Sequence, residues 1–293
     1  MNSVERSTHF EEQPAALRRA ALFRETPWAA LRRYVLGVAW TLRPKRISRL
    51  IPIARVSIAH LMHPSRPLPD TRALAPHAEI VGVATDLTPA TLMQAYARGL
   101  FPHGHIAPLK WVCPPMRAVV RPQDFHISSR LRSIMRQARY QVTFDTDFEG
   151  VIEGCAAPRR GWLSLTWITP QIMAAYAQLF DAGHVHSFEV WNKKGELAGG
   201  GYGVAVGRVF VIESQFFRES NASKIGFAVL AWHLAKWGFV LMDNKWLTPA
   251  TERAGFSDIP REDYLAQLPK PGEPPVHPGR WRVEADPKTV VSG

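Results

Sequence analysis

The sequence predicts an α/β fold organised around an antiparallel β-meander. Three runs rich in β-branched and aromatic residues follow one another closely, at Val185–Trp191, Leu197–Val206 and Val209–Ser214. Asn192–Glu196 supplies turn residues between the first two runs. Asn221-Ala222-Ser223-Lys224 then opens a helix, because Asn and Ser side chains accept hydrogen bonds from the free amides of a first turn. A generic β-sheet protein would also fit these elements taken alone.

The composition indicates a globular chain with a polyanionic partner. The 293 residues are 46% hydrophobic, which is enough for a sizeable core, and they carry a net charge of +11. Residues 1–75 hold 13 Lys and Arg against 5 Asp and Glu, so most of the excess positive charge lies in the first quarter of the chain. Nucleic acid and an anionic membrane are both partners that such a charge attracts.

Residues 1–76 are predicted to form a basic helical extension that ends in a Pro-rich linker. Its three helices each have Pro at or near the first turn, where a missing amide costs little: Pro14–Glu25, Pro27–Leu42 and Pro44–Met62. The second is amphipathic, and its apolar face holds Trp28, Leu31, Val35, Val38, Ala39 and Leu42. Such a helix packs on the rest of the protein, lies in a membrane interface or follows an RNA backbone, and the sequence leaves all three open.

Residues 77–268 are predicted to form one domain, and residues 269–293 a Pro-rich, partly ordered tail. Thr88-Pro89 and Thr169-Pro170 open helices that stop at Gly99 and Gly183. Loops are predicted at Phe101–Pro115 and, as a mobile segment, at Ala157–Leu165. The other predicted elements are strands at Ala118–Arg121, Tyr140–Phe144 and Phe239–Met242 and helices at Ser128–Ala138, Phe148–Ala156, Thr248–Ala254 and Arg261–Leu268.

Several short strings in this domain also occur, in order and with similar spacing, in one bacterial family. They are Gly99 to Pro102, Val151 to Ala156, Thr166 to Thr169, His184 to Trp191, Gly199-Gly200 with Tyr202 to Val204, Glu213-Ser214 with Phe216, and Asn221 to Lys224. From about Ala84 to about Leu268 the chain therefore resembles the leucyl/phenylalanyl-tRNA–protein transferases. The resemblance implies a GNAT-like acyltransferase fold, with a mixed, largely antiparallel central sheet flanked by helices, in which aminoacyl-tRNA is the donor.

The resemblance also implies where the adenosine end of the donor binds. Trp111, Trp167 and Tyr176 match family positions at that end, although Trp167 and Tyr176 would also suit a core. A tryptophan face stacks on a base with about 1–3 kcal/mol. His103 and Val112 stand where the family usually has Trp, so a thinner stacking platform is expected.

Further substrate contacts are implied at Gly201, Tyr202, Ser214 and Gln215. Gly201 and Gln215 replace residues that are usually larger or apolar in the family, which predicts a wider and more polar pocket for the transferred side chain. Specificity for Leu or Phe is therefore not carried over. The predicted helix Ser128–Ala138 and the residue after it carry a cluster of arginines. This cluster is either a solvated face or a contact for the tRNA acceptor stem, and it consists of Arg130, Arg132, Arg136 and Arg139.

Three residues are the candidate catalytic groups. Glu213 lies near the end of an apolar strand, where burial of an unpaired carboxylate is costly, and Asp243 follows another apolar strand. The resemblance places Glu213 near the donor amino acid and aligns Asp243 with the catalytic Asp of the family. The family has Gln two residues after this Asp, whereas this chain has Lys245. Lys245 is predicted to pair with Asp243, to act as a base or to repel a cationic acceptor.

The predicted reaction is attack of an amine on an aminoacyl ester, without a covalent enzyme intermediate, because the ester is already activated. No cofactor is expected, and His184 and His186 lack the neighbours of a metal site. The expected partners are aminoacyl-tRNA and the N-terminus of a protein or peptide, with a membrane surface as a further option through the N-terminal helices. The alternatives are an RNA-binding protein without catalysis and a transferase with a lipid or small-molecule acceptor.

A cytoplasmic monomer is expected. The first residues lack the apolar core of a secretory signal, and no run of about 18 apolar residues suggests a membrane span. The two cysteines, Cys113 and Cys155, provide no disulfide framework and suit a reducing compartment.

Overall fold

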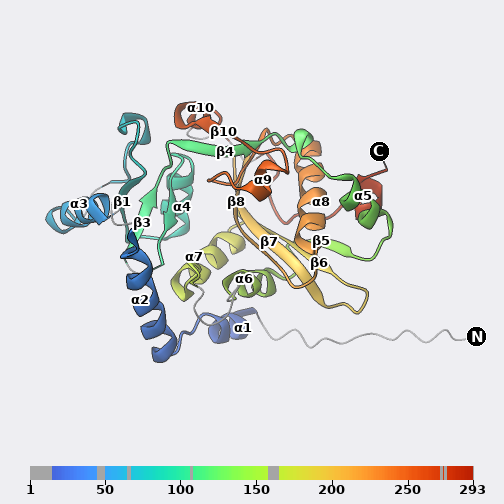
Figure 1. The fold of residues 1–293 in the computed structure, drawn as a ribbon, viewed down its shortest axis with the longest axis horizontal. Helices are drawn as coiled ribbons and strands as arrows, with labels where there is room; N and C mark the ends of the chain where they lie inside the picture. The colour runs from blue at the N-terminus through green and yellow to red at the C-terminus, as the bar shows by residue number, and fades with distance from the viewer. Residues whose placement is uncertain are drawn as a thin grey trace, which may run out of the picture.

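The computed structural model describes residues 15–44, 50–64, 67–105, 108–157, 165–270, 273 and 276–292. In this part of the chain the strands form a seven-stranded sheet, in the order β10-β4-β9-β8-β7-β6-β5, and a three-stranded sheet, in the order β1-β3-β2 (Figure 1). Neighbouring strands are antiparallel except β8 and β9, which run parallel. The predicted α/β class, with a mixed and largely antiparallel sheet flanked by helices, is confirmed.

The strands are β1 (Ile80–Ala84), β2 (Phe101–His103), β3 (Leu109–Val112), β4 (Met116–Val120), β5 (Gln141–Phe144), β6 (Val185–Trp191), β7 (Leu197–Val206), β8 (Val209–Phe217), β9 (Leu241–Asp243) and β10 (Ser257–Pro260). The helices are α1 (Ala15–Leu22), α2 (Pro27–Thr41), α3 (Leu50–Met62), α4 (Pro89–Tyr96), α5 (Ser129–Arg136), α6 (Phe148–Ala156), α7 (Pro170–Asp181), α8 (Ala222–Lys236), α9 (Pro249–Glu252), α10 (Arg261–Leu265) and α11 (Pro287–Val290).

The predicted meander is the centre of the large sheet. Strands β6 and β7 have the predicted bounds, and β8 continues three residues beyond Ser214 to Phe217. In the β6–β7 turn, the side-chain oxygen of Asn192 accepts the N–H groups of Lys194 and Glu196 at 3.0 Å each, and Gly195 adopts φ 77°. Local turn chemistry therefore sets the register of β6 against β7.

Helices cover both faces of the large sheet, and a separate apolar core lies on each face. One core includes side chains of α6 and α7, such as Val151 and Leu179, packed under Val204 of β7. The other includes side chains of α8, such as Ile225 and Leu234. Figure 1 shows α6 and α7 on one side of the long strands and α8 on the other. The ends of the central strands are consequently enclosed between the two helical layers.

Two local predictions for this domain were wrong. Phe101–Pro115 is not a loop throughout, because β2 and β3 within it pair with each other and β3 pairs with β1. Asn221 precedes α8 as expected but adopts φ 70°, and its side chain makes no capping hydrogen bond to the helix. The strands depend on pairing with a distant segment, and the helix start depends on a left-handed backbone conformation. Local sequence pattern encodes neither.

The C-terminal segment 276–292 is not a loosely attached tail. Trp281 is fully buried, and its ring stacks on His186 with the centroids 3.7 Å apart. His186 also contacts Asp145 through Nδ1 at 2.8 Å, and the Trp281 amide donates to the same carboxylate. The segment therefore completes the core beside β6, and His186 has the structural role that its sequence context predicted.

The N-terminal extension is attached to the domain by ion pairs. Arg18 of α1 pairs with Asp147 at 2.6 Å, and Arg19 pairs with Glu149 and Asp181 at 2.7 and 2.6 Å. Figure 1 shows α1 beside α6, and α2 and α3 near the three-stranded sheet. No helix in the described residues is both long and apolar enough to cross a membrane.

Helix α2 presents its apolar face to solvent. The exposed fractions of Trp28, Leu31, Val35 and Leu42 are 74%, 54%, 56% and 56%. Packing of this face on the rest of the protein, one of the three alternatives drawn from the sequence, is therefore wrong for these residues. The basic side of α2 faces the domain instead, through Arg33.

Candidate active site

Parallel pairing of β8 with β9 brings the three candidate catalytic residues together. Val211 lies beside Asp243, so Glu213, two residues further along β8, lies next to the turn that follows β9. Lys245 in that turn adopts φ 66°, a conformation that is uncommon for a residue with a side chain. Its backbone N–H donates to Asp243 Oδ1 at 2.7 Å, which fixes the turn.

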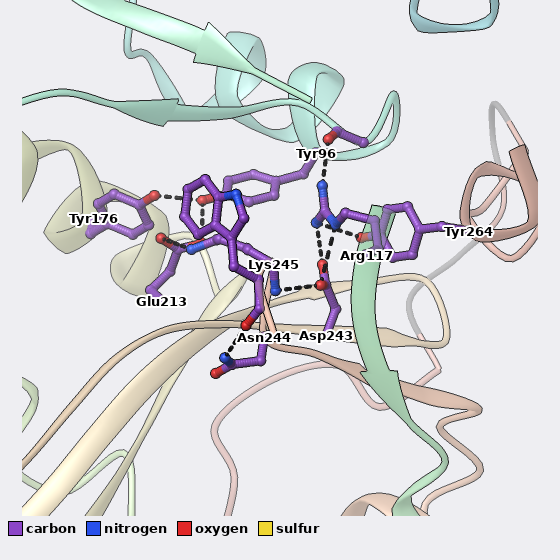
Figure 2. A network of polar contacts seen from close by, with 10 residues as sticks. Tyr96, Arg117, Tyr176, Glu213, Asp243, Asn244, Lys245 and Tyr264 are labelled. Atoms are coloured by element: carbon purple, nitrogen blue, oxygen red, sulfur yellow. Dashed lines mark hydrogen bonds and ion pairs between the residues drawn. The ribbon is translucent and has the colours of Figure 1, made fainter. Parts of the chain in front are cut away.

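Asp243 forms a buried ion pair with Arg117 of β4. The exposed fractions of the two side chains are 0% and 1%. Two nitrogens of the Arg117 guanidinium, Nε and Nη2, donate to the two carboxylate oxygens, and the third, Nη1, donates to the Gly99 carbonyl at 2.9 Å (Figure 2). The ring of Tyr264 lies 4.1 Å from the guanidinium carbon and its hydroxyl lies 3.2 Å from Nη2. Both charges are thus satisfied within the protein, as burial requires.

Lys245 pairs with Glu213 and not with Asp243, so the predicted Asp243–Lys245 ion pair is wrong. Its ammonium nitrogen lies 2.7 Å from Glu213 Oε2, and Tyr96 donates to Glu213 Oε1 at 2.7 Å (Figure 2). The hydroxyls of Tyr96 and Tyr176 are also hydrogen-bonded to each other. The turn after β9 explains the difference, because Lys245 itself is its left-handed residue. This conformation directs the backbone N–H of Lys245 to Asp243 and its side chain to Glu213 of β8.

Burial lowers the pKa of Lys245, and the charge of Glu213 offsets part of that change. The ammonium group also lies 4.9 Å from the ring centre of Phe101 and 5.6 Å from that of Trp167. Burial and then the charge of Glu213 raise the pKa values of Tyr96 and Tyr176 well above their ordinary value, so both stay protonated. The arrangement is a lysine able to release or accept a proton beside fixed hydrogen-bond donors.

A cavity of about 470 Å³ opens next to this ion pair. It brings together the predicted residues Trp167, Glu213, Ser214, Gln215 and Lys245, and with them His103, which was expected at the stacking platform. It also includes residues that the sequence did not single out for this site: Arg32, Asn244 and Trp246. Trp246 and His103 lie 5.4 Å apart between ring centres, and His103 lies 5.6 Å from Trp167. These three rings form one side of the cavity, here called the aromatic wall: His103, Trp167 and Trp246.

Asp243, Tyr176 and Tyr202 lie behind the lining of this cavity. Tyr176 and Tyr202 are fully buried with ring centres 5.5 Å apart, and Tyr176 reaches the site through Tyr96. The Tyr202 hydroxyl is buried without a hydrogen-bond partner among the described residues. These positions suit support of the ion pair better than direct contact with a substrate.

Trp111 does not line this cavity. It is buried in β3, opposite Gly82 of β1 and Pro102 of β2, and it borders a different cavity of about 620 Å³. Strand pairing that local sequence did not predict turns its ring toward α3 residues such as Val56. Trp246, which directly follows Lys245, lines the cavity beside Lys245 together with Trp167.

Gly201 is also separated from this cavity. A Cβ at residue 201 would lie 2.7 Å from the ring of Phe188 and 2.8 Å from the Ser214 carbonyl. The space that a larger residue would take is already filled by Phe188, which packs between β7 and Gly226 of α8. The absence of a side chain at Gly201 therefore does not widen the space beside Lys245.

The four predicted nucleic-acid-binding arginines are exposed on α5 and just after it: Arg130, Arg132, Arg136 and Arg139. A groove of about 830 Å³ begins at the start of α5, where Ser128 and Leu131 line it. It shares lining residues with the cavity beside Lys245, namely Ala157, Gln215, Asn244, Ala250 and Thr251. The groove thus leads from the basic helix to the candidate active site.

Arg117 and Tyr96 are the functional residues that sequence reasoning missed. Arg117 stands immediately before a predicted apolar strand, and a buried arginine in such a place calls for a carboxylate partner. Residues 158–164 of the predicted mobile segment Ala157–Leu165 lie outside the described residues. Within the described residues no group of three or more His, Cys, Asp and Glu side chains is placed to hold a metal ion.

Comparison with known proteins identifies the family. Residues 85–115 match the family model of the leucyl/phenylalanyl-tRNA protein transferase N-terminal domain, and residues 119–269 match that of the leucyl/phenylalanyl-tRNA protein transferase. Leucyl/phenylalanyl-tRNA–protein transferases of Alkalilimnicola ehrlichii and Pseudomonas syringae pv. tomato are 42% and 45% identical over 226 and 201 residues, which are 76% and 68% of this chain and 87% of each relative. The one of Desulfatibacillum aliphaticivorans is 42% identical over 208 residues, 71% of this chain and 89% of the relative. The chain belongs to the leucyl/phenylalanyl-tRNA–protein transferase family.

Proposed function

We propose that this protein transfers an amino acid from aminoacyl-tRNA to the α-amine at the N-terminus of a protein, without a covalent enzyme intermediate. The observation that carries the proposal is the buried Lys245–Glu213 pair beside a cavity with an aromatic wall. An amine that attacks an ester needs a proton acceptor and fixed positions for both substrates. The site offers both in a chain that belongs to a transferase family.

Lys245 is proposed as the general base. The acceptor nitrogen forms a bond to the ester carbon, its proton passes to the neutral Lys245 amine, and the bond from the carbon to the ribose oxygen breaks. Lys245 then returns the proton to that oxygen. The lowered pKa makes the neutral lysine accessible, and Glu213 at 2.7 Å stabilises the cation that forms.

Asp243 is proposed as a positioning residue. Its side chain is fully buried, and it holds the Lys245 backbone and Arg117. Trp167, Ser214 and Gln215 are proposed to contact the aminoacyl-adenosine end of the donor, since they line the cavity. Direct contact with the donor is not proposed for four other predicted residues, because they border another cavity or lie within the packed interior: Trp111, Tyr176, Gly201 and Tyr202.

The tRNA acceptor stem is proposed to approach along the groove beside α5. Four arginines are exposed on α5 and just after it, and phosphate contacts from such side chains supply sequence-independent affinity: Arg130, Arg132, Arg136 and Arg139. The continuity of this groove with the cavity beside Lys245 supports the direction of approach. The domain limits 1–76, 77–268 and 269–293 are kept as a proposal, in which residues 276–292 of the last segment pack against the domain.

The test of this function is incubation of the protein with separately labelled aminoacyl-tRNAs, acceptor peptides with each N-terminal residue, and cell lysate. Label in the peptide N-terminus supports the proposal and gives both the donor amino acid and the acceptor. Label in lipid or a small molecule would change the acceptor class. Retention of all label on tRNA, with tRNA bound, would contradict catalysis and favour an RNA-binding protein.

We further propose that this protein acts as a cytoplasmic monomer whose N-terminal helices rest on an anionic membrane. Trp28, Leu31, Val35 and Leu42 form an exposed stripe on α2, and α3 exposes Ile51, Ile58, Leu61 and Met62 by 60%, 57%, 78% and 69%. The extension is also basic, which favours anionic lipid. Both cysteines are free, as suits a reducing compartment.

Substitution of Trp28 and Leu31 by Ser is expected to lower binding to vesicles that contain phosphatidylglycerol by about tenfold, because a membrane-inserted apolar face loses most of its area. Cosedimentation of wild type and variant with phosphatidylglycerol and with pure phosphatidylcholine vesicles measures the effect. The control is Phe217→Ser, because Phe217 is an exposed apolar residue outside the N-terminal helices. Equal vesicle binding by all three proteins, or a Trp28-dependent dimer in sedimentation, would contradict the membrane proposal.

A further inference from the structure

Arg33 and Trp40 of helix α2 hold this helix beside the candidate active site. Arg33 makes two hydrogen bonds to the Glu25 carboxylate, at 2.9 and 2.8 Å, and a third to the His105 carbonyl at 3.4 Å. The ring of Trp40, also on α2, lies edge-on to His105 with the centroids 4.4 Å apart. The N-terminal extension is therefore fixed next to the end of β2.

Arg32 lines the cavity that contains Lys245 and Glu213. It is half-buried, and it makes no ion pair or hydrogen bond with any other residue that the structure describes. The other cation of the described lining, Lys245, is already paired with Glu213 at 2.7 Å. An arginine directed to a cavity without a carboxylate partner leaves its fork of donors available to an anion.

The neighbours of Arg32 indicate which anion it binds. His103, Trp167 and Trp246 line the same cavity, and the ring centre of His103 lies 5.6 Å from that of Trp167 and 5.4 Å from that of Trp246. Aromatic faces hold a nucleobase by stacking, and a nearby cation then pairs with the phosphate of the same or the adjoining nucleotide. An acidic side chain of the acceptor would use the arginine alone and leave the aromatic wall unexplained.

We propose that Arg32 binds a phosphate group at the 3′ end of the aminoacyl-tRNA, so that the N-terminal extension contributes a residue to the donor site. This inference rests on the proposed function. Arg32 lies outside both segments that match the family models, residues 85–115 and 119–269. The contact is therefore a property of this chain's extension, and it ties the docking of α2 to binding of the donor.

The test uses two stable donor analogues, 3′-amino-3′-deoxyadenosine acylated with phenylalanine, with and without a 5′-phosphate. Calorimetry measures the preference of each protein for the phosphorylated compound. Wild type is expected to prefer it by about tenfold, as for a charge-assisted hydrogen bond, and Arg32→Gln should abolish most of that preference. Arg32→Lys should keep part of it, since the charge remains without the fork.

Arg24→Gln is the matched control, because Arg24 is an exposed arginine of the same extension that does not line the cavity. An undiminished phosphate preference in Arg32→Gln would overturn the inference. So would unchanged affinity for both analogues combined with weaker transfer to peptides that begin with Asp or Glu, which would assign Arg32 to the acceptor. Failure of wild type to bind either analogue would count instead against the proposed donor, so the two ideas fail separately.

Discussion

Replacement of Lys245 by Met should slow single-turnover transfer from labelled aminoacyl-tRNA by about 10²- to 10⁴-fold, the usual contribution of a general base. The amine is the group that accepts the proton in the proposed reaction, and Met fills a similar volume without it. Donor affinity should change little, because the contacts of the aromatic wall and of Arg32 stay in place. Rapid-quench measurement of transfer at saturating enzyme separates the chemical step from binding.

Lys245→Gln distinguishes a base from a hydrogen-bond donor. If proton transfer to the lysine is required, the Gln variant should be as slow as the Met variant, even though Gln is the residue that the family has two positions after its Asp. A wild-type rate in Lys245→Gln would contradict the proposed base and show that a neutral donor is sufficient. Transfer that moves toward acceptors with basic N-terminal residues would show that the lysine excludes them by charge.

The pH dependence provides an independent check. Only neutral Lys245 can accept a proton, so the wild-type rate should rise with pH until the lysine is deprotonated, and burial moves that rise below the ordinary pKa of lysine. The α-amine of the acceptor also titrates, at a pKa of about 8, so the comparison must use one acceptor throughout. Lys245→Gln should retain only the rise that belongs to the acceptor.

A structural control addresses the charge left behind. Removal of Lys245 leaves the Glu213 carboxylate without its cation in a buried site, which itself destabilises the fold. The double variant Lys245→Met with Glu213→Gln should recover stability in thermal unfolding but not transfer. Recovery of transfer as well would mean that the loss in the single variant came from the unpaired charge.

Local sequence pattern was sufficient for the elements that carry this site. The alternation in β6 and β7, the Thr-Pro starts of α4 and α7 and the bounds of α6 all follow from short-range chemistry, and the structure has them where they were expected. The candidate residues Glu213, Asp243 and Lys245 were found because the chain resembles a known family. The position of Asp243 at the end of β9 needed nothing beyond that strand, whereas Glu213 was expected near a strand end and β8 continues past it to Phe217.

The partners of these residues could not be predicted, because they depend on contacts between distant segments. Arg117 meets Asp243 only because β4 pairs with β9, with Val119 opposite Asp243. Lys245 turns to Glu213 because its backbone is left-handed, which no residue preference favours for lysine. The exposed face of α2 was unpredictable for a related reason, since an amphipathic pattern defines two faces but not which of them meets the domain.

Asp243→Asn is expected to destabilise the protein by about 3–5 kcal/mol, because it leaves the Arg117 guanidinium buried without its carboxylate. Chemical denaturation of wild type, Asp243→Asn and the double variant with Arg117→Met measures the pair, and the double variant should regain much of the loss. Asn keeps an oxygen for the Lys245 backbone N–H, whereas Asp243→Ala removes it.

The same variants decide whether Asp243 acts by position or as the base. At a temperature where each variant is folded, Asp243→Asn should transfer faster than Asp243→Ala, and its rate should keep the pH rise assigned to Lys245. That order follows if the aspartate orients the turn that carries the lysine, since only Asn preserves the hydrogen bond to its amide. Equal and complete inactivity of both variants at every pH, with donor binding and folding intact, would make Asp243 the proton acceptor in place of Lys245.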